Sequence, residues 1–332
     1  MKWLLVSFLL MATAAHAEEP ISFTGFIDAA YIWNRNHPSN HENFVPGTGT
    51  SGKRGNELSL NLAQVQWSRA VSEENPIGFT LSLVAGDGTE VVHAGEPDGG
   101  DEFRHIYQAS LAWRLRNGVA LEAGVYPSHI GVEGFYSKDN WNYTRSWLGE
   151  FSPYYQAGIK ASYAFNARWS GQLHVLNGWQ IIHDNNDGKA IGTQLAYANG
   201  PISASFNTYF DADRKFGDVV VLYRVRPRLQ LGGSVDLGTQ DHADWRGAGA
   251  YARFAVDDHH AVAVRAEQFR DPDNGITGTP QTLREMTLTY ELRPREHLIL
   301  KLETRYDRST AAVFAGEQRD QFLALAGAVV TF

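Results

Sequence analysis

The segment Gly47-Thr48-Gly49-Thr50-Ser51-Gly52-Lys53 has the residue types that could bind a phosphate group. Its spacing fits two glycine-rich nucleotide-binding patterns, in which backbone N–H groups surround the phosphates and a lysine adds positive charge. The lysine pattern also needs Ser or Thr as its next residue, a buried strand before it and a helix after it. Arg54 follows the lysine here, and the surrounding stretch is polar and glycine-rich. We therefore predict a surface loop and no nucleotide site.

Two other clusters have the residue types of metal ligands. Asp184–Gly188 resembles part of a calcium-binding loop but lacks the closing Glu at the required distance. Asp257–His260 falls in an expected tight turn, where solvated polar residues are the simpler interpretation. The chain has no Cys, which excludes a thiolate nucleophile, and no G-x-S-x-G motif accompanies its Ser and His residues. We predict no catalytic residue, no metal and no cofactor, and therefore a protein that is not an enzyme.

The most informative charged residues are those that alternate with apolar ones. In the segment 298–307, the even-numbered positions begin with three leucines, at 298, 300 and 302. The odd-numbered positions between and after them include Lys301, Glu303 and Arg305. Successive side chains of a strand point to opposite faces, so one face of this segment is apolar and the other is charged. The same reasoning along the chain predicts a water-facing wall of pore-lining residues: Arg114, Lys160, Arg224, Asp236, Arg253, Arg265, Glu267, Glu291, Lys301, Glu303 and Arg305. These charges would either set up a field across a pore or form cross-strand ion pairs, and the sequence leaves both open.

The connection 127–151 combines charged and aromatic residues. Its charged residues are Glu133, Lys138, Asp139, Arg145 and Glu150, and they lie among Phe, Tyr and Trp side chains. A loop this aromatic would be poorly placed in bulk water, so we predict that it folds inward and forms a constriction. The alternative is an external loop that packs on its neighbours, as many loops do.

Period-two alternation recurs along the whole chain and predicts sixteen strands of about ten residues, the length of a tilted strand that crosses a bilayer. The connections between these strands alternate between short turns and longer polar loops, which is typical of outer-membrane barrels. Lipid offers no hydrogen-bond partners, so such a sheet must close, and sixteen strands leave an aqueous channel. The predicted fold class is all-β, a transmembrane antiparallel up-and-down β-barrel. The predicted strands begin near Ile21, Glu57, Ile77, Arg104, Val119, Tyr154, Arg168, Lys189, Ile202, Asp218, Arg228, Arg246, His260, Leu283, His297 and Arg319.

Composition supports this class. The chain is 12% aromatic, yet its mean hydropathy is only −0.33, which suits a barrel whose strands are half water-facing. Outside the N-terminal segment there is no apolar run of the length that a spanning helix needs, and a net charge of −8 argues against a nucleic-acid partner. Aromatic residues near strand ends are expected on the lipid side, in the two interfacial belts. They are Tyr31, Trp33, Tyr107, Trp113, Tyr155, Tyr163, Trp169, Trp179, Tyr197, Tyr223 and Tyr306.

The N-terminal segment has the features of an export signal. Met1 and Lys2 precede an apolar run that is too short to span a bilayer, and Ala15-His16-Ala17 forms a cleavage site. We predict a signal peptide at residues 1–17 and an outer-membrane β-barrel at 18–332. The terminal Phe332 resembles the signal by which the barrel-assembly machinery recognises such proteins.

A short block resembles a known family. The block contains Asn140–Ser146, Ser152–Tyr155, Asn177–Trp179 and Asp184–Asn186, and the recognisable region runs from about 141 to 197. It is similar to the OmpL-like β-barrel porin family of Gram-negative envelopes. The resemblance implies an outer-membrane barrel and a diffusion channel. It implies no substrate and no catalytic residue.

The sequence therefore predicts an outer-membrane porin of a Gram-negative bacterium, with a channel for passive diffusion of small hydrophilic solutes or ions. The expected partners are outer-membrane lipid, lipopolysaccharide, the assembly machinery and the solutes, and a homo-oligomer is allowed. Two alternatives stay open. One is a barrel-embedded hydrolase, for which Ser128 and His129 near a rim are the only suggestion, and the other is a non-conducting structural or adhesive barrel.

Overall fold

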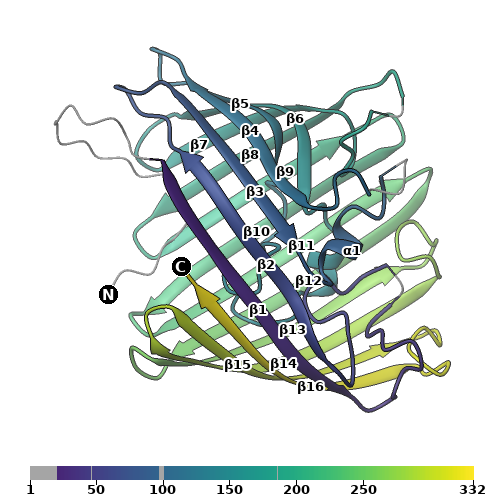
Figure 1. Ribbon diagram of the computed structural model, residues 1–332. Helices are drawn as coiled ribbons and strands as arrows, with labels where there is room; N and C mark the ends of the chain where they lie inside the picture. The colour runs from purple at the N-terminus through teal and green to yellow at the C-terminus, as the bar shows by residue number, and fades with distance from the viewer. Residues whose placement is uncertain (1–20, 46, 97–100, 185) are drawn as a thin grey trace.

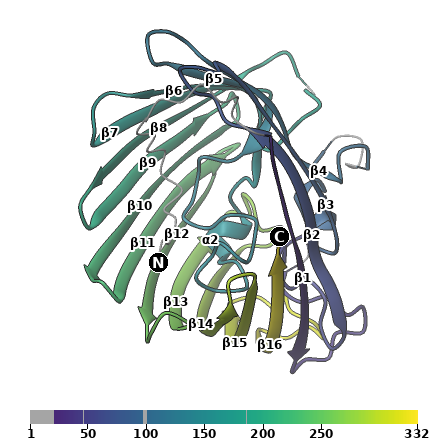
Figure 2. The same cartoon turned by 60° about the vertical axis from the view of Figure 1, so that its left-hand side comes forward.

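A computed structural model describes residues 21–45, 47–96, 101–184 and 186–332, and their strands form one closed antiparallel barrel (Figures 1 and 2). Each strand pairs with its neighbours in sequence, and the first pairs with the last. The sixteen strands are β1 (Ser22–Asn34), β2 (Leu58–Arg69), β3 (Ile77–Ala85), β4 (Ile106–Arg114), β5 (Ala120–Pro127), β6 (Tyr155–Ala164), β7 (Trp169–Leu176), β8 (Ala190–Asn199), β9 (Ile202–Phe210), β10 (Arg214–Arg226), β11 (Leu229–Gln240), β12 (Ala243–Ala255), β13 (His260–Asp271), β14 (Gln281–Arg295), β15 (Leu298–Ser309) and β16 (Asp320–Thr331).

The predicted fold class and strand number are confirmed. The largest difference in a strand start is at β10, which was expected from Asp218 and begins at Arg214. The predicted signal peptide, residues 1–17, lies outside the described residues.

Alternation determines which side chains face outward. On β15, Leu302 is 57% exposed on the outer surface, whereas the next residue toward the N-terminus, Lys301, is 1% exposed. The outward face of the other strands carries the same kind of exposed apolar side chain, for example Leu111, Ile159 and Val235. An apolar outer band and a closed hydrogen-bonded ladder satisfy what a lipid environment requires of a sheet.

The connections are sorted by the end of the barrel at which they lie. One end holds the long connections 35–57, 86–105, 128–154 and 177–189, and the opposite end holds short turns such as 115–119, 200–201 and 227–228. Two short helices lie in long connections: α1 (Thr89–Val92), which was not predicted, and α2 (Trp147–Glu150). Among the described residues, no helix is long and apolar enough to span a membrane.

Two of the aromatic residues expected on the lipid side are buried instead. Tyr107 is 5% exposed and contacts the rings of Phe135 and Tyr136, because a register shift between Ser82 and Leu83 changes its facing. Tyr155 is fully buried because the connection after α1 covers it. The His93 ring lies 4.7 Å from the Tyr155 ring, and the Tyr155 hydroxyl donates to Glu96.

Trp179 was also expected on the lipid side and is only partly exposed. It packs on Tyr209 and Phe216, with ring centroids 4.9 and 5.3 Å apart. Both partners are buried, inward-facing residues, so Trp179 belongs to the inner packing at the long-loop end.

Candidate functional site

The connection between β5 and β6, residues 128–154, lies against the inner wall of the barrel, and we call it the lumen loop. Its helix α2 is seen inside the ring of strands in Figure 2. The loop makes hydrogen bonds to inward-facing side chains of β1, β13, β14 and β15. These strands belong to one half of the barrel, and most of the loop's bonds are to this half. Its first residues also bind the other half, where Gly131 donates to Asp218 of β10 and Gln194 of β8 donates to the carbonyl of His129.

Glu303 on β15 makes the most extensive contact with the loop. Its carboxylate accepts from the backbone N–H of Tyr143 at 2.5 Å, the N–H of Thr144 at 3.0 Å and the Thr144 hydroxyl at 2.5 Å. The hydroxyl of Thr289 on β14 donates to it at 2.7 Å. Hydrogen bonds to a charged acceptor are stronger than neutral ones, so this single side chain fixes the middle of the loop.

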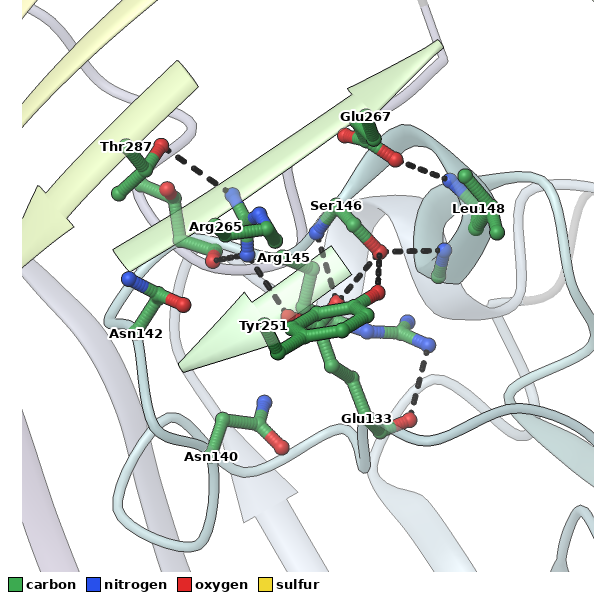
Figure 3. Close-up of polar contacts among 12 residues, drawn as sticks. Glu133, Asn140, Asn142, Arg145, Ser146, Leu148, Tyr251, Arg265, Glu267 and Thr287 are labelled. Carbon is green, nitrogen blue, oxygen red and sulfur yellow. Dashed lines mark hydrogen bonds and ion pairs between the residues drawn. The ribbon is translucent and has the colours of Figure 1, made fainter. Parts of the chain in front are cut away.

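Arg265 on β13 forms a second anchor (Figure 3). Its Nη1 donates to Glu133 Oε1 and to the backbone carbonyl of Thr144, each at 2.7 Å, and its Nε donates to Glu285 at 3.0 Å. Ser146 donates its N–H and its hydroxyl to the second oxygen of Glu133 at 2.7 and 2.6 Å. Burial alone would raise the pKa of Glu133, but Arg265 and the Ser146 bonds outweigh it and lower that pKa below its usual range.

The first turn of α2 is held in the same way. Glu267 on β13 accepts from the N–H groups of Trp147 at 2.5 Å and Leu148 at 3.1 Å, and the Ser146 hydroxyl caps the helix by accepting from Gly149 at 2.9 Å. These N–H groups have no partner within the helix, so a carboxylate from the wall satisfies them.

Cations of β15 bind backbone carbonyls of the loop. Lys301 donates to the carbonyls of Ser137 at 2.8 Å and Asn140 at 2.7 Å, and Arg305 donates to the carbonyl of Arg145 at 2.5 Å. Both cations are almost fully buried. Buried charges of this kind need hydrogen-bonded partners, and here the loop backbone supplies them.

The wall is also shaped to accept the loop. Tyr143 donates its hydroxyl to Asp28 on β1 at 2.7 Å, and its ring lies over Gly327 of β16. A Cβ at Gly327 would lie 2.6 Å from Tyr143 Cε2, which is too close for any side chain. The glycine therefore leaves the space that the tyrosine ring occupies.

All eleven predicted pore-lining residues lie at inward positions, but they divide into two groups. Seven are less than 9% exposed because the loop or neighbouring side chains cover them: Asp236, Arg265, Glu267, Glu291, Lys301, Glu303 and Arg305. Four reach solvent: Arg114, Lys160, Arg224 and Arg253. The covered residues cannot line open water, because most of them hold the loop or form ion pairs. The pore-lining role of the other four stays a prediction.

The five predicted constriction-loop residues divide similarly. Glu133 and Arg145 are buried beside one another, whereas Lys138 is part-exposed, Asp139 is exposed, and these two pair at 2.8 Å. Glu150 accepts from Gly49 N–H at 2.8 Å and from the Thr50 hydroxyl at 2.7 Å. The glycine-rich segment that resembles a phosphate loop thus binds a carboxylate of the lumen loop.

The residues around Ser128 and His129 do not form a catalytic pair. The His129 Nε2 faces the carbonyl of Thr208 at 3.2 Å, its Nδ1 has no hydrogen-bond partner among the described residues, and its ring stacks on His174 at 4.1 Å. Burial lowers the pKa of His129 to about 4, so the ring is neutral at pH 7. The Ser128 hydroxyl instead accepts from Ile130 N–H. No group of three or more acidic or histidine side chains within the described ranges could hold a metal.

Sequence reasoning missed the uncharged residues that hold the loop. Ser137, Asn142, Tyr143, Thr144 and Ser146 supply many of its contacts, through hydroxyl, amide or backbone groups. A signal was present, because four of these five residues lie in the block that resembles the OmpL-like family. Their roles depend on long-range contacts that alternation does not reveal.

A closed sixteen-stranded barrel with an apolar outer band, a polar inner wall and an inward loop defines the class of porin-type outer-membrane barrels. The chain belongs to the family described as "Putative beta-barrel porin-2, OmpL-like", whose model matches residues 20–332. The predicted family is thereby confirmed. Family and fold together place the chain in the outer membrane of Gram-negative bacteria.

Solved structures share the fold at low sequence identity. An anion-selective porin from Comamonas acidovorans matches with a TM-score of 0.64 and 13% identity, covering 94% of this chain and 99% of that one. The outer membrane channel DcaP of Acinetobacter baumannii matches with a TM-score of 0.62 and 9% identity, covering 97% and 100%. The trimer form of OmpT, an outer membrane protein of Vibrio cholerae, matches with a TM-score of 0.60 and 11% identity, covering 94% and 99%. No curated protein sequence matches the chain.

The lipid-facing assignment can be tested on β9. Phe206 is 52% exposed on the outer face, and its neighbour Ser205 faces inward. Phe206→Arg should destabilise the folded barrel by about 2–4 kcal/mol, because it places a cation near the bilayer midplane. Ser205→Arg, the matched control, adds the same charge to the inner wall and should fold nearly as well as the parent. Equilibrium unfolding in phospholipid vesicles measures both, and equal losses would contradict the assignment.

Proposed function

We propose that this protein is a porin whose aqueous channel lets small hydrophilic solutes or ions diffuse passively across the outer membrane. The observation that carries the proposal is an uneven inner wall. Inward side chains of β13–β15 are mostly buried by the lumen loop, whereas inward side chains of β7–β9 such as Ser170, Gln172 and Ser203 reach solvent. A sixteen-stranded barrel is too wide for side chains to fill, so the less covered half supports a water-filled passage.

The lumen loop is the proposed constriction. It narrows the interior mainly on the side of β13–β15, and the passage would run between the loop and the inward faces of β6–β12. Lys160, Arg224 and Arg253 are the predicted wall residues that would line this passage, and Arg114, at the end of β4, would lie outside those strands. Lys138 and Asp139 are the predicted loop charges that would face it, since both reach solvent.

Conductance in a planar bilayer tests the proposal. Purified, folded protein should produce discrete current steps in KCl, because each inserted barrel adds one water-filled path. Folded protein that inserts and gives no steps would overturn the porin assignment and favour a structural or adhesive barrel. Lipid or peptide hydrolysis by detergent-solubilised protein would favour the enzyme alternative, against which the different hydrogen-bond partners of Ser128 and His129 argue.

The proposed partners follow from the surface and the family. Outer-membrane lipid and lipopolysaccharide would contact the apolar outer band, and the assembly machinery would recognise the last strand through Phe332. The Phe332 backbone pairs with Gly25 of β1 at the seam of the barrel. A homo-oligomer is also proposed, and the trimeric form of one structural neighbour supports it.

A further inference from the structure

The inner wall formed by β6–β12, which the lumen loop covers only in part, has an excess of positive charge. On β6–β12 the acidic residues at inward positions are Asp218 and Asp236, which are 1% and 2% exposed. Asp218 accepts from the N–H of Gly131 in the lumen loop, and Asp236 accepts from Ser234. Neither carboxylate therefore faces the passage.

The basic residues of the same wall do reach solvent. Lys160 on β6 is 18% exposed and pairs with Glu122 of β5 at 2.6 Å. Arg224 on β10 is exposed, and its guanidinium has no hydrogen bond or ion pair with any residue that the structure describes. Arg253 on β12 is 17% exposed. Across these strands the charge presented to water is positive, and Arg224 contributes most of the excess, because Glu122 of β5, which is 19% exposed, offsets the charge of Lys160.

Arg224 and Arg253 lie in one row of the sheet. Arg224 faces Gln230 in the register of β10 with β11, and Gln230 faces Arg253 in the register of β11 with β12. Two strand spacings put the two arginine backbones about 10 Å apart, so their long side chains can reach one small anion between them. Gln230 adds a neutral donor at the centre of the row.

Arg293 on β14 extends this basic band. Arg253 and Arg293 both bind Glu291, with N–O distances of 2.9 Å, so one carboxylate is shared by two guanidinium groups. Both guanidinium groups keep their positive charge at any ordinary pH. We call Arg224, Gln230, Arg253 and Arg293 the arginine band.

Resting on the proposed channel function, we infer that the passage is selective for anions and that the arginine band is a weak binding site for oxyanions, meaning small solutes with carboxylate or phosphate groups. A guanidinium group matches the geometry of a carboxylate or a phosphate and binds either through two parallel hydrogen bonds. A weak site suits a channel, because a solute must be attracted to enter and must then leave.

The test is the reversal potential of reconstituted protein in a tenfold KCl gradient, compared among three proteins. The parent should be permeable to chloride more than to potassium. Arg224→Glu should lower the chloride-to-potassium permeability ratio at least about twofold, since it reverses the most exposed charge of the band. Arg246→Glu is the matched control, because Arg246 is an exposed residue on the outward face of β12 and the net charge changes equally. Its ratio should equal that of the parent.

Ionic strength and added anions provide a second readout. The chloride preference should increase as KCl falls from about 1 M to about 0.1 M, because the distance over which the wall charges act then grows from roughly 3 Å to roughly 10 Å. Sodium succinate and sodium phosphate, tested separately, should each reduce the chloride current of the parent more than that of Arg224→Glu. A reduction by only one of them would assign the band to that chemical class.

The outcomes separate this inference from the proposed function. Absence of current steps would overturn the channel itself. Steps with potassium preference, with no preference, or with equal shifts for Arg224→Glu and Arg246→Glu would overturn anion selectivity and leave the porin intact.

Discussion

Deletion of residues 134–146 should raise the single-channel conductance roughly twofold or more, because the lumen loop covers the inner wall of β13–β15 in a barrel too wide to be filled otherwise. The deletion is feasible because the two ends of the deleted segment lie close together in the structure. Ser146 donates its N–H to the Glu133 carboxylate at 2.7 Å, so a two-glycine bridge can join the cut ends. Single-channel recording in KCl measures the change.

The control for this deletion keeps the chain length. Replacing 134–146 by thirteen Gly and Ser residues removes the anchoring side chains but leaves a connection of equal length. Its conductance should also exceed that of the parent, with larger current fluctuations, because nothing holds the segment to the wall. If the deletion leaves conductance unchanged, the lumen loop is not the constriction.

Glu303→Ala should release the middle of the lumen loop. The change removes the acceptor of two backbone N–H groups and two hydroxyls. It also removes one of the carboxylates whose negative charge stabilises the buried Lys301 cation. Loss of one partner from a buried charged network costs about 3–5 kcal/mol. Hydrogen exchange of the Tyr143 and Thr144 amides, measured on the detergent-folded barrel, should accelerate strongly.

Glu122→Ala is the matched control for Glu303→Ala. Glu122 is an inward glutamate that binds Lys160, Gln108 and Ser110, all outside the lumen loop. Its removal should leave exchange at Tyr143 and Thr144 as in the parent. Equal protection in the Glu303→Ala protein would show that Glu303 does not hold the loop.

Strand number and facing could be predicted because alternation is a local property of the sequence. Lys301 and Leu302 are neighbours in the chain, and their types alone assign them to opposite faces. A register shift breaks this rule at Tyr107, whose inward position depends on how β3 pairs with β4. Local periodicity contains no information about such a bulge.

The binding partners of the charged inner-wall residues could not be predicted from alternation. The sequence left open whether the charges set up a field or form ion pairs, and the structure shows a third use, in which Glu303, Arg265 and Lys301 bind the lumen loop. Glu303 and Tyr143 are 160 residues apart, so only the closed barrel brings them together. The glycine-rich segment at 47–53 is similar, because its amides face Glu150 from about 100 residues away.

Tyr143 contacts strands from the beginning and from near the end of the barrel sequence. Its hydroxyl binds Asp28 in the first strand, and its N–H binds Glu303 in the fifteenth. Contacts between such distant parts of a chain form late, because the intervening segments must be ordered first. Loop docking is therefore coupled to closure of the β1–β16 seam, and a barrel that is still open during assembly would have its interior uncovered. The lumen loop can therefore reach its final position only after the last strand has paired with the first.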